Sequence, residues 1–152
     1  MSWNIFNFRS KKKRFTENKI RFYLEIDLII EGASGGLLIG RSHHEGGITV
    51  IHFNDFNQIE HTYEIEGYEY LLNPFATNLD RDRIIRINEN YKSGIGDFEP
   101  YDIPAHIKTI HLEPKSINNT LVYPLLLLSK LPQMVMNRAA TQNHLDYLNK
   151  LN

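Results

Sequence analysis

Residues 48–66, ITVIHFNDFNQIEHTYEIE, contain two runs typical of β-strands, residues 48–53 and 58–66. In residues 58–66 the apolar set shares one parity and the glutamates share the other. A period of two indicates a strand with one buried and one solvated face. Residues 48–53 predict a second strand close by in the chain. Sequential strands joined by short turns favour antiparallel pairing.

Outside this pair, the sequence predicts further strands early in the chain and helices later. Residues 19–31, KIRFYLEIDLIIE, alternate almost perfectly between apolar and polar side chains. The alternation that begins at residue 58 changes parity at Gly67, which suggests a bulge or a turn. The sequence therefore predicts an α+β fold built on an antiparallel β-meander. Its four to five strands are expected at about 19–31, 37–41, 48–53, 58–72 and 106–112.

Helices are expected to pack on this sheet. Residues 77–92 follow a 3.6-residue period, and Thr77 with Asp80 has the spacing of a capping box. Residues 120–151 are predicted to be helical as well. Their first half is strongly apolar but contains prolines, so we expect a buried helix that kinks near Pro132 and continues as an amphipathic helix.

Charge is distributed unevenly along the 152 residues, whose formal net charge is -1. Residues 1–21 carry seven basic side chains and one acidic one, whereas residues 22–152 carry ten basic and seventeen acidic ones. We expect a flexible basic arm over residues 1–16 and a single α+β domain over residues 17–152. Residues 1–21 are a candidate contact for nucleic acid or an anionic membrane.

Composition excludes several classes of function. The chain has no cysteine, which removes disulfides, thiolate nucleophiles and Cys-ligated metal centres. We find no nucleotide-binding loop, nucleophile elbow or zinc-binding helix, and no secretion signal or transmembrane segment is expected. The sequence therefore predicts a cytoplasmic protein that uses no cofactor and has no assigned catalytic residue.

Four histidines lie close together in the sequence. Such residues can bind zinc or transfer protons, but their spacing matches no ligand motif. They are weak metal candidates, and they leave open a small metal-dependent or acid–base hydrolase as an alternative function. The four residues are His43, His44, His52 and His61.

A set of acidic side chains on the fourth predicted strand is the preferred candidate site. Glutamates on one strand face repel one another, and a basic partner could offset that cost. Neighbouring tyrosines could anchor the same partner. The expected partner-binding residues are Asp55, Glu60, Glu64, Glu66, Tyr63, Tyr68 and Tyr70.

In its small size, absence of cysteine and of catalytic motifs, and acidic α+β body, the chain resembles the immunity proteins of bacterial polymorphic toxin systems. These include contact-dependent inhibition and type VI secretion systems. The resemblance implies a cytoplasmic, non-enzymatic protein that binds one cognate toxin, often a basic nuclease, and covers its active site. The hydrolase and an adaptor that binds nucleic acid or membrane through the basic arm remain the alternatives.

Overall fold

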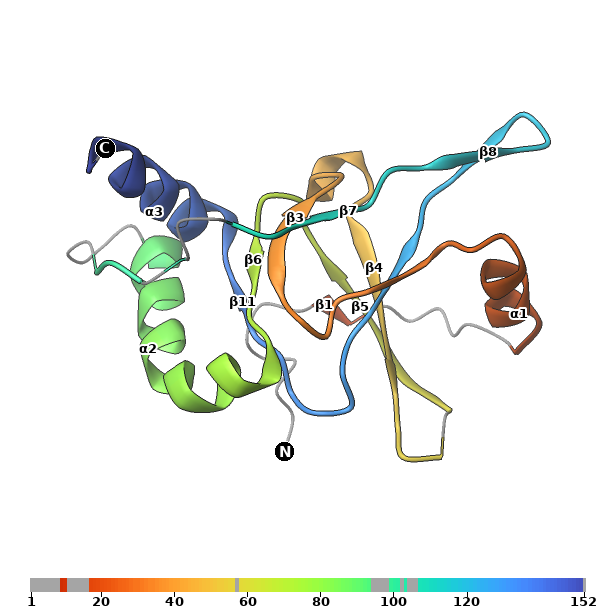
Figure 1. Cartoon of the computed structure of the whole chain (residues 1–152), viewed down its shortest axis with the longest axis horizontal. Helices are drawn as coiled ribbons and strands as arrows, with labels where there is room; N and C mark the ends of the chain where they lie inside the picture. The colour runs from red at the N-terminus through yellow and green to blue at the C-terminus, as the bar shows by residue number, and fades with distance from the viewer. Residues whose placement is uncertain are drawn as a thin grey trace.

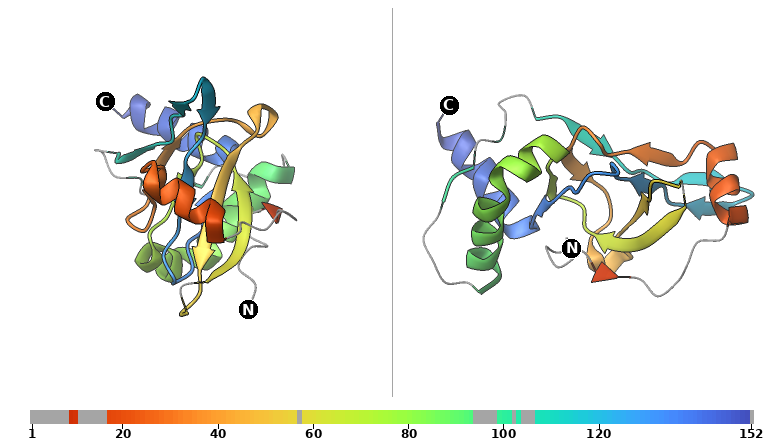
Figure 2. Two further views of the ribbon diagram at one scale, coloured as in Figure 1. Left: turned by 90° about the vertical axis from the view of Figure 1, so that its right-hand side faces the viewer. Right: turned by 90° about the horizontal axis from the view of Figure 1, so that it is seen from below.

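The computed structural model describes residues 9–10, 17–56, 58–93, 99–101, 103 and 107–151, and these residues have an α+β fold (Figure 1). Two mixed sheets form the middle of the molecule. Helix α1 lies at one end, and a pair of helices lies at the other (Figure 2). The helices are α1 (Glu17–Glu25), α2 (Pro74–Ser93) and α3 (Arg138–Lys150).

The larger sheet has five strands, and its centre comes from late in the chain. Strand β10 pairs in parallel with β4 on one side and β2 on the other, whereas β5 is antiparallel to both β4 and β1. A central parallel strand is buried on both faces and is therefore apolar throughout. In order, the strands are β1 (Arg9–Ser10), β5 (Ile59–Ile65), β4 (Ile48–Phe53), β10 (Leu125–Leu127) and β2 (Ile29–Glu31).

The smaller sheet has four strands and also mixes directions. Strand β3 is parallel to β7 and antiparallel to β6. Its strands, in order, are β11 (Val135–Met136), β6 (Tyr70–Leu71), β3 (Gly36–Ile39) and β7 (Thr109–His111). A separate hairpin joins β8 (Lys115–Ile117) to β9 (Thr120–Val122) through Asn118 and Asn119, which both have positive φ. Asparagine favours this left-handed turn conformation.

Two hydrophobic clusters hold these elements together. The first lies between the sheets and includes Leu38, Val50 and Leu126, all fully buried. The second lies between the smaller sheet and the helix pair and includes Ile84 and Met136. The fold therefore has its core where the two sheets and the α2–α3 pair meet.

Residues 19–31 are not one strand, so this part of the predicted meander is wrong. The first part forms helix α1, and only Ile29–Glu31 form a strand. Ile20 and Tyr23, which are three residues apart, share the half-buried face of the helix, while Leu24 is exposed. The alternating pattern had assigned Ile20 and Leu24 to the same buried face. Asp27, with a φ of 55°, follows the helix and turns the chain.

The expected helix at the start of residues 120–151 is also wrong. This apolar run forms strands β9 and β10, and only α3 in this region is an α-helix. A short apolar run is compatible with a buried helix or with a buried central strand, and periodicity alone does not distinguish them. Here Leu125 and Leu126 fill the gap between β4 and β2, where backbone hydrogen bonds are available on both sides.

The antiparallel meander itself is replaced by mixed sheets. Residues 37–41 contribute β3 to the smaller sheet instead of pairing with β4, and residues 58–72 divide into β5 and β6. Residues 106–112 contain β7, which joins β3 in parallel. The antiparallel pair formed by 48–53 and 58–66 is confirmed, and its register places His52 opposite His61.

Helix α2 confirms the helix predicted over 77–92, but its cap differs. The Asn73 carboxamide oxygen accepts a hydrogen bond from Ala76 N at 2.7 Å, so Asn73 caps the helix. The Thr77 hydroxyl instead accepts from Met134 N at 3.0 Å, and the Asp80 carboxylate accepts from the Tyr101 hydroxyl at 2.6 Å. Both predicted capping residues therefore bind neighbouring segments.

Gln133 joins three segments inside the fold. Its side-chain nitrogen donates to Gly32 O at 2.8 Å and to Leu72 O at 2.9 Å, and its side-chain oxygen accepts from Ser129 N at 2.7 Å. The side chain is fully buried. These bonds link the end of β2, the end of β6 and the turn after β10.

We predict that Gln133→Leu lowers the free energy of unfolding by about 3 kcal/mol or more, because it removes three hydrogen bonds of a fully buried side chain, and among the described residues only Gly32 O keeps another donor, Gly35 N. Urea denaturation measures this change. Gln142→Leu, at an exposed position on α3, is the control and should change stability by less than about 0.5 kcal/mol. Equal midpoints for the two variants would contradict the role assigned to Gln133.

Candidate functional site: a hairpin tip and a cavity

The predicted acidic surface is divided between the two ends of β5. Asp55 lies in the loop before β5 and is exposed, whereas Glu64 and Glu66 lie at the far end of the strand. At about 3.3 Å per residue, the two ends of β5 (Ile59–Ile65) are roughly 20 Å apart. The Glu60 side chain lies outside the described residues. The structure therefore does not bring Asp55, Glu64 and Glu66 together on one contact surface.

Glu64 and Glu66 hold the short 3₁₀ helix η2 (His43–Glu45) in place. Glu64 Oε2 lies 2.5 Å from His43 Nδ1, and Glu66 Oε1 accepts from His43 N at 2.7 Å. Gly47 has a φ of 69°, and a Cβ placed on it would lie only 2.6 Å from the Glu64 side chain. These two carboxylates are therefore part of a packed loop, in which both contact His43.

The three candidate tyrosines differ in exposure. Tyr63 is only 3% exposed and belongs to the core between the sheets, so it offers no surface to a partner. Tyr70 is half-buried, and burial raises the pKa of its hydroxyl. Tyr68 is exposed, and the Arg138 guanidinium lies 5.2 Å from its ring centroid. Tyr68 is thus the most accessible of the three.

The candidate histidines occupy two separate places. His43 and His44 lie in η2 with their ring centroids 5.7 Å apart, whereas His52 is buried near the end of β4, where its Nε2 lies 3.3 Å from Lys130 O. The His61 side chain lies outside the described residues. Within the described part of the chain, no group of three or more histidine or carboxylate side chains is placed to hold a metal ion.

Most of the basic arm also lies outside the described residues, namely 1–8 and 11–16. Arg9 and Ser10 form β1, which extends the larger sheet beside β5 and places Arg9 opposite Glu64 in the register. Lys19 and Arg21 are on α1 and are exposed. None of the described helices is long and apolar enough to span a lipid bilayer.

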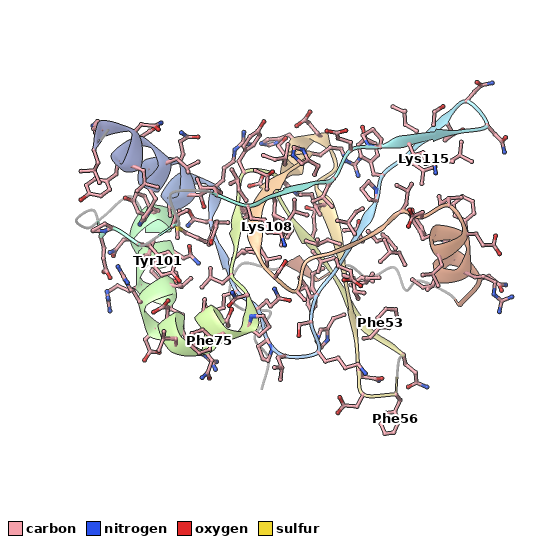
Figure 3. The ribbon with its side chains drawn as sticks, viewed as in Figure 1. Phe53, Phe56, Phe75, Tyr101, Lys108 and Lys115 are labelled. Atoms are coloured by element: carbon pink, nitrogen blue, oxygen red, sulfur yellow. The ribbon has the colours of Figure 1, made fainter. Side chains whose placement is uncertain are left out.

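The hairpin between β4 and β5 projects from the rest of the molecule, and Phe56 lies at its tip (Figure 3). The Phe56 side chain is 82% exposed. Its position is fixed by Asn54, whose side-chain oxygen accepts hydrogen bonds from Phe56 N at 2.9 Å and Gln58 N at 3.1 Å. Asn54 N also donates to Gln58 O at 2.9 Å. These three hydrogen bonds form an Asx-turn arrangement that restrains the backbone at Phe56 and Gln58.

A bulge lies next to the tip. His52 pairs with His61 and Phe53 pairs with Ile59, which leaves Glu60 as an additional residue in β5. Bulges of this kind bend a strand and change the direction in which its end points. The tip, defined by residues 54–56 and 58, is therefore a bent projection that presents an aromatic ring beside the carboxylate of Asp55.

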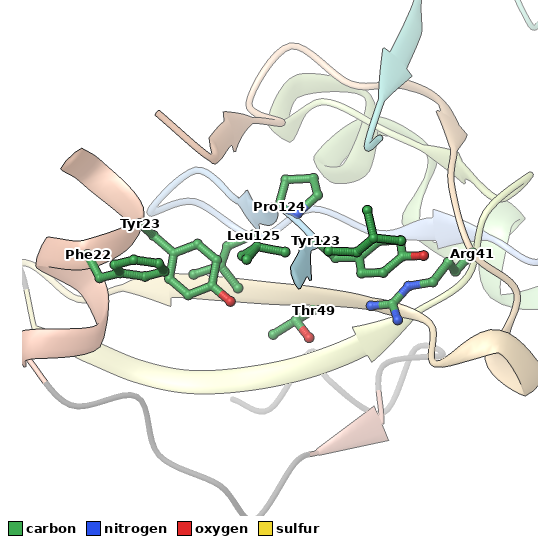
Figure 4. Close-up of a pocket in the computed structure, with 9 residues that line it drawn as sticks. Phe22, Tyr23, Arg41, Thr49, Tyr123, Pro124 and Leu125 are labelled. Carbon is green, nitrogen blue, oxygen red and sulfur yellow. The ribbon is translucent and has the colours of Figure 1, made fainter. Parts of the chain in front are cut away.

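A cavity of about 380 Å³ lies at the other end of β4, beside α1 (Figure 4). Thr49 and Leu125 are register neighbours on β4 and β10 and lie at its base. Phe22 and Tyr23 of α1 lie on one side, and burial raises the pKa of the Tyr23 hydroxyl. The remaining lining residues are Arg41, Leu121, Val122, Tyr123 and Pro124.

Sequence reasoning assigned no role to these cavity residues. Arg41 lies just after β3 and Tyr123 lies between β9 and β10, so 82 positions of sequence separate two side chains that touch. The predicted helix at the start of residues 120–151 would have placed Tyr123 elsewhere. A correct assignment of β10 is needed before the cavity can be expected.

Comparisons with family models, curated proteins and solved structures give no match to this chain.

We predict that Glu66→Ala increases hydrogen exchange at the His43 amide, because this change removes the carboxylate that accepts its hydrogen bond. The expected increase is about tenfold, which corresponds to roughly 1.4 kcal/mol of lost protection. Amide exchange followed by NMR measures it. Glu113→Ala, at an exposed carboxylate near His111, is the control and should leave this amide unchanged. Unchanged exchange in Glu66→Ala would show that the loop does not depend on this bond.

Proposed function

We propose that the protein is an inhibitor that binds a cognate bacterial toxin and covers its active site with the hairpin tip. The observation that carries the proposal is the exposed Phe56 ring on a tip whose backbone donates hydrogen bonds to Asn54. The function belongs to the class suggested by the resemblance to immunity proteins. The contact surface differs from the acidic strand face expected from the sequence.

The shape of the tip supports binding to a concave partner. A narrow projecting hairpin matches a cleft better than it matches a flat surface, and active sites are generally concave. Aromatic side chains are enriched in protein interfaces and supply much of the buried area. Because the Phe56 backbone is already fixed, less conformational entropy is lost on binding than for a mobile loop.

Charge supports a basic cleft as the partner. Asp55 is exposed directly beside Phe56, and residues 22–152 carry seventeen acidic side chains against ten basic ones. Enzymes that bind phosphate groups line their clefts with Lys and Arg. The acidic segment 22–152 is attracted to such a cleft from a distance, and a carboxylate at the tip can pair with a cation inside it.

We predict that Phe56→Ala weakens toxin binding by at least about tenfold, because truncation of a buried aromatic anchor typically costs more than 1 kcal/mol. Phe75→Ala is the matched control, since Phe75 on α2 is also a highly exposed phenylalanine, at 76%. Wild type and both variants are used to capture proteins from the native bacterium, and the purified partner is then titrated with each.

The proposal requires that wild type and Phe75→Ala abolish the activity of that partner at equal molar amounts and that Phe56→Ala does not. Thermal unfolding checks that both variants remain folded. Full inhibition by Phe56→Ala would exclude the tip as the contact surface. A captured partner that keeps its activity when saturated with wild-type protein would exclude the inhibitor function.

A second prediction separates rigidity from direct contact. Asn54→Ala removes the acceptor of two backbone hydrogen bonds and leaves Phe56 and Asp55 in place. We expect a several-fold loss of affinity, because the tip must then be ordered during binding, at a cost of about 1 kcal/mol. Surface plasmon resonance measures it. Wild-type affinity in Asn54→Ala would show that the hydrogen bonds of Asn54 do not contribute to recognition.

A further inference from the structure

The cavity beside α1 has a cation in one wall. The Arg41 guanidinium carbon lies 3.4 Å from the centroid of the Tyr123 ring, so the two groups are stacked. Arg41 Nη1 donates to Glu45 O at 3.3 Å. A guanidinium has five N–H donors in one plane. When its face stacks on a ring, these donors still point outward from the edge of the group. Carboxylates bind to such an edge with two parallel hydrogen bonds.

Other polar groups face the same space. In Figure 4 the Tyr23 hydroxyl and the Arg41 guanidinium approach Thr49 from opposite sides. Arg41 also acts on the Tyr23 hydroxyl electrostatically and lowers its pKa, although burial, the larger effect, raises it. The lining residues described here include Arg41 but no carboxylate. The cavity therefore combines one positive charge with the hydroxyl groups of Thr49 at its base and Tyr23 at its side, an arrangement that suits an anion.

The rest of the lining is apolar. Phe22 is 41% exposed and Leu121 is 61% exposed at the rim, and Pro124 and Leu125 lie deeper. A few convergent polar groups in an otherwise apolar cavity are typical of small-molecule sites. The volume of about 380 Å³ is near the lower end of the usual range of about 300–1,000 Å³. This size suits one ring with a short acidic chain better than a nucleotide.

We propose that this cavity binds a carboxylate attached to a small aromatic or branched apolar group. The carboxylate lies against the edge of the Arg41 guanidinium, and the apolar group packs between Phe22 and Tyr123. The site is separate from the hairpin tip and does not depend on the inhibitor function. Two sources can supply this chemistry, a free organic acid or the C-terminal residue of a peptide.

The test uses 3-phenylpropionate as the probe and 3-phenylpropionamide as its uncharged match. Binding to the full chain is followed by NMR chemical-shift titration. We expect shifts at residues 22, 23, 49 and 123 with the acid, and binding of the amide that is at least about tenfold weaker, because it lacks the charge-assisted bonds to Arg41. Equal binding of acid and amide, or shifts confined to other residues, would overturn the proposal.

Variants test the arginine directly. Arg41→Gln should weaken binding of the acid by at least about tenfold, and Arg41→Lys should give a smaller loss, because lysine keeps the charge but not the planar fork. Arg21→Gln, on the exposed surface of α1, is the matched control and should bind as wild type does. If Arg41→Gln fails to fold, Thr49→Val supplies the test, with a several-fold loss expected. Wild-type affinity in the folded variants would overturn the proposal.

Two peptides distinguish the sources. One ends in a phenylalanine with a free carboxylate, and the other has the same sequence with an amidated end. Binding of the free peptide at least about tenfold tighter than 3-phenylpropionate, with loss on amidation, would identify a protein C-terminus as the ligand. Binding of the small acid that equals or exceeds that of the free peptide would identify a free organic acid. If neither the acid nor the free peptide binds, the proposal is wrong, whatever the result at the hairpin tip.

Discussion

The structure depends on the insertion of β10 between β4 and β2. Leu125–Leu127 pair with both neighbours in parallel, and Leu126 is completely buried in the core between the two sheets. Parallel neighbours cannot be joined by tight turns, so the chain must complete most of its length before this sheet closes. Gln133 follows β10 directly and links the ends of β2 and β6. One late segment therefore fixes the relative position of both sheets.

This central strand also determines which surfaces remain open. Helices α2 and α3 pack at the end of the molecule next to β11, whereas α1 lies at the opposite end (Figures 1 and 2). The cavity lies where α1 meets β4 and the segment that leads into β10. The hairpin tip extends beyond the other end of β4. The two candidate sites thus lie at opposite ends of β4.

The sequence predicted features that depend on neighbours in the chain and missed those that depend on distant pairing. The β4–β5 hairpin and α2 follow from local period and are confirmed. The alternation over residues 19–31 is compatible with a strand, but only Ile29–Glu31 find a partner, β10. Leu125–Leu127 have no local feature that separates a buried strand from a buried helix. The cavity was missed for the same reason, because Tyr123 meets Arg41 only after β10 is in place.

The acidic residues show why charge alone is a weak guide to a binding surface. Glu64 and Glu66 alternate with apolar residues as a solvated face should, yet their carboxylates hold His43 and the loop at Gly47. A carboxylate whose oxygens are engaged within its own loop is less available for direct contact with a partner. Phe56 is the opposite case, because a large apolar side chain is exposed while its backbone is fixed by Asn54. Most of the Phe56 side chain would leave water on binding, which is why the tip is the stronger candidate for binding.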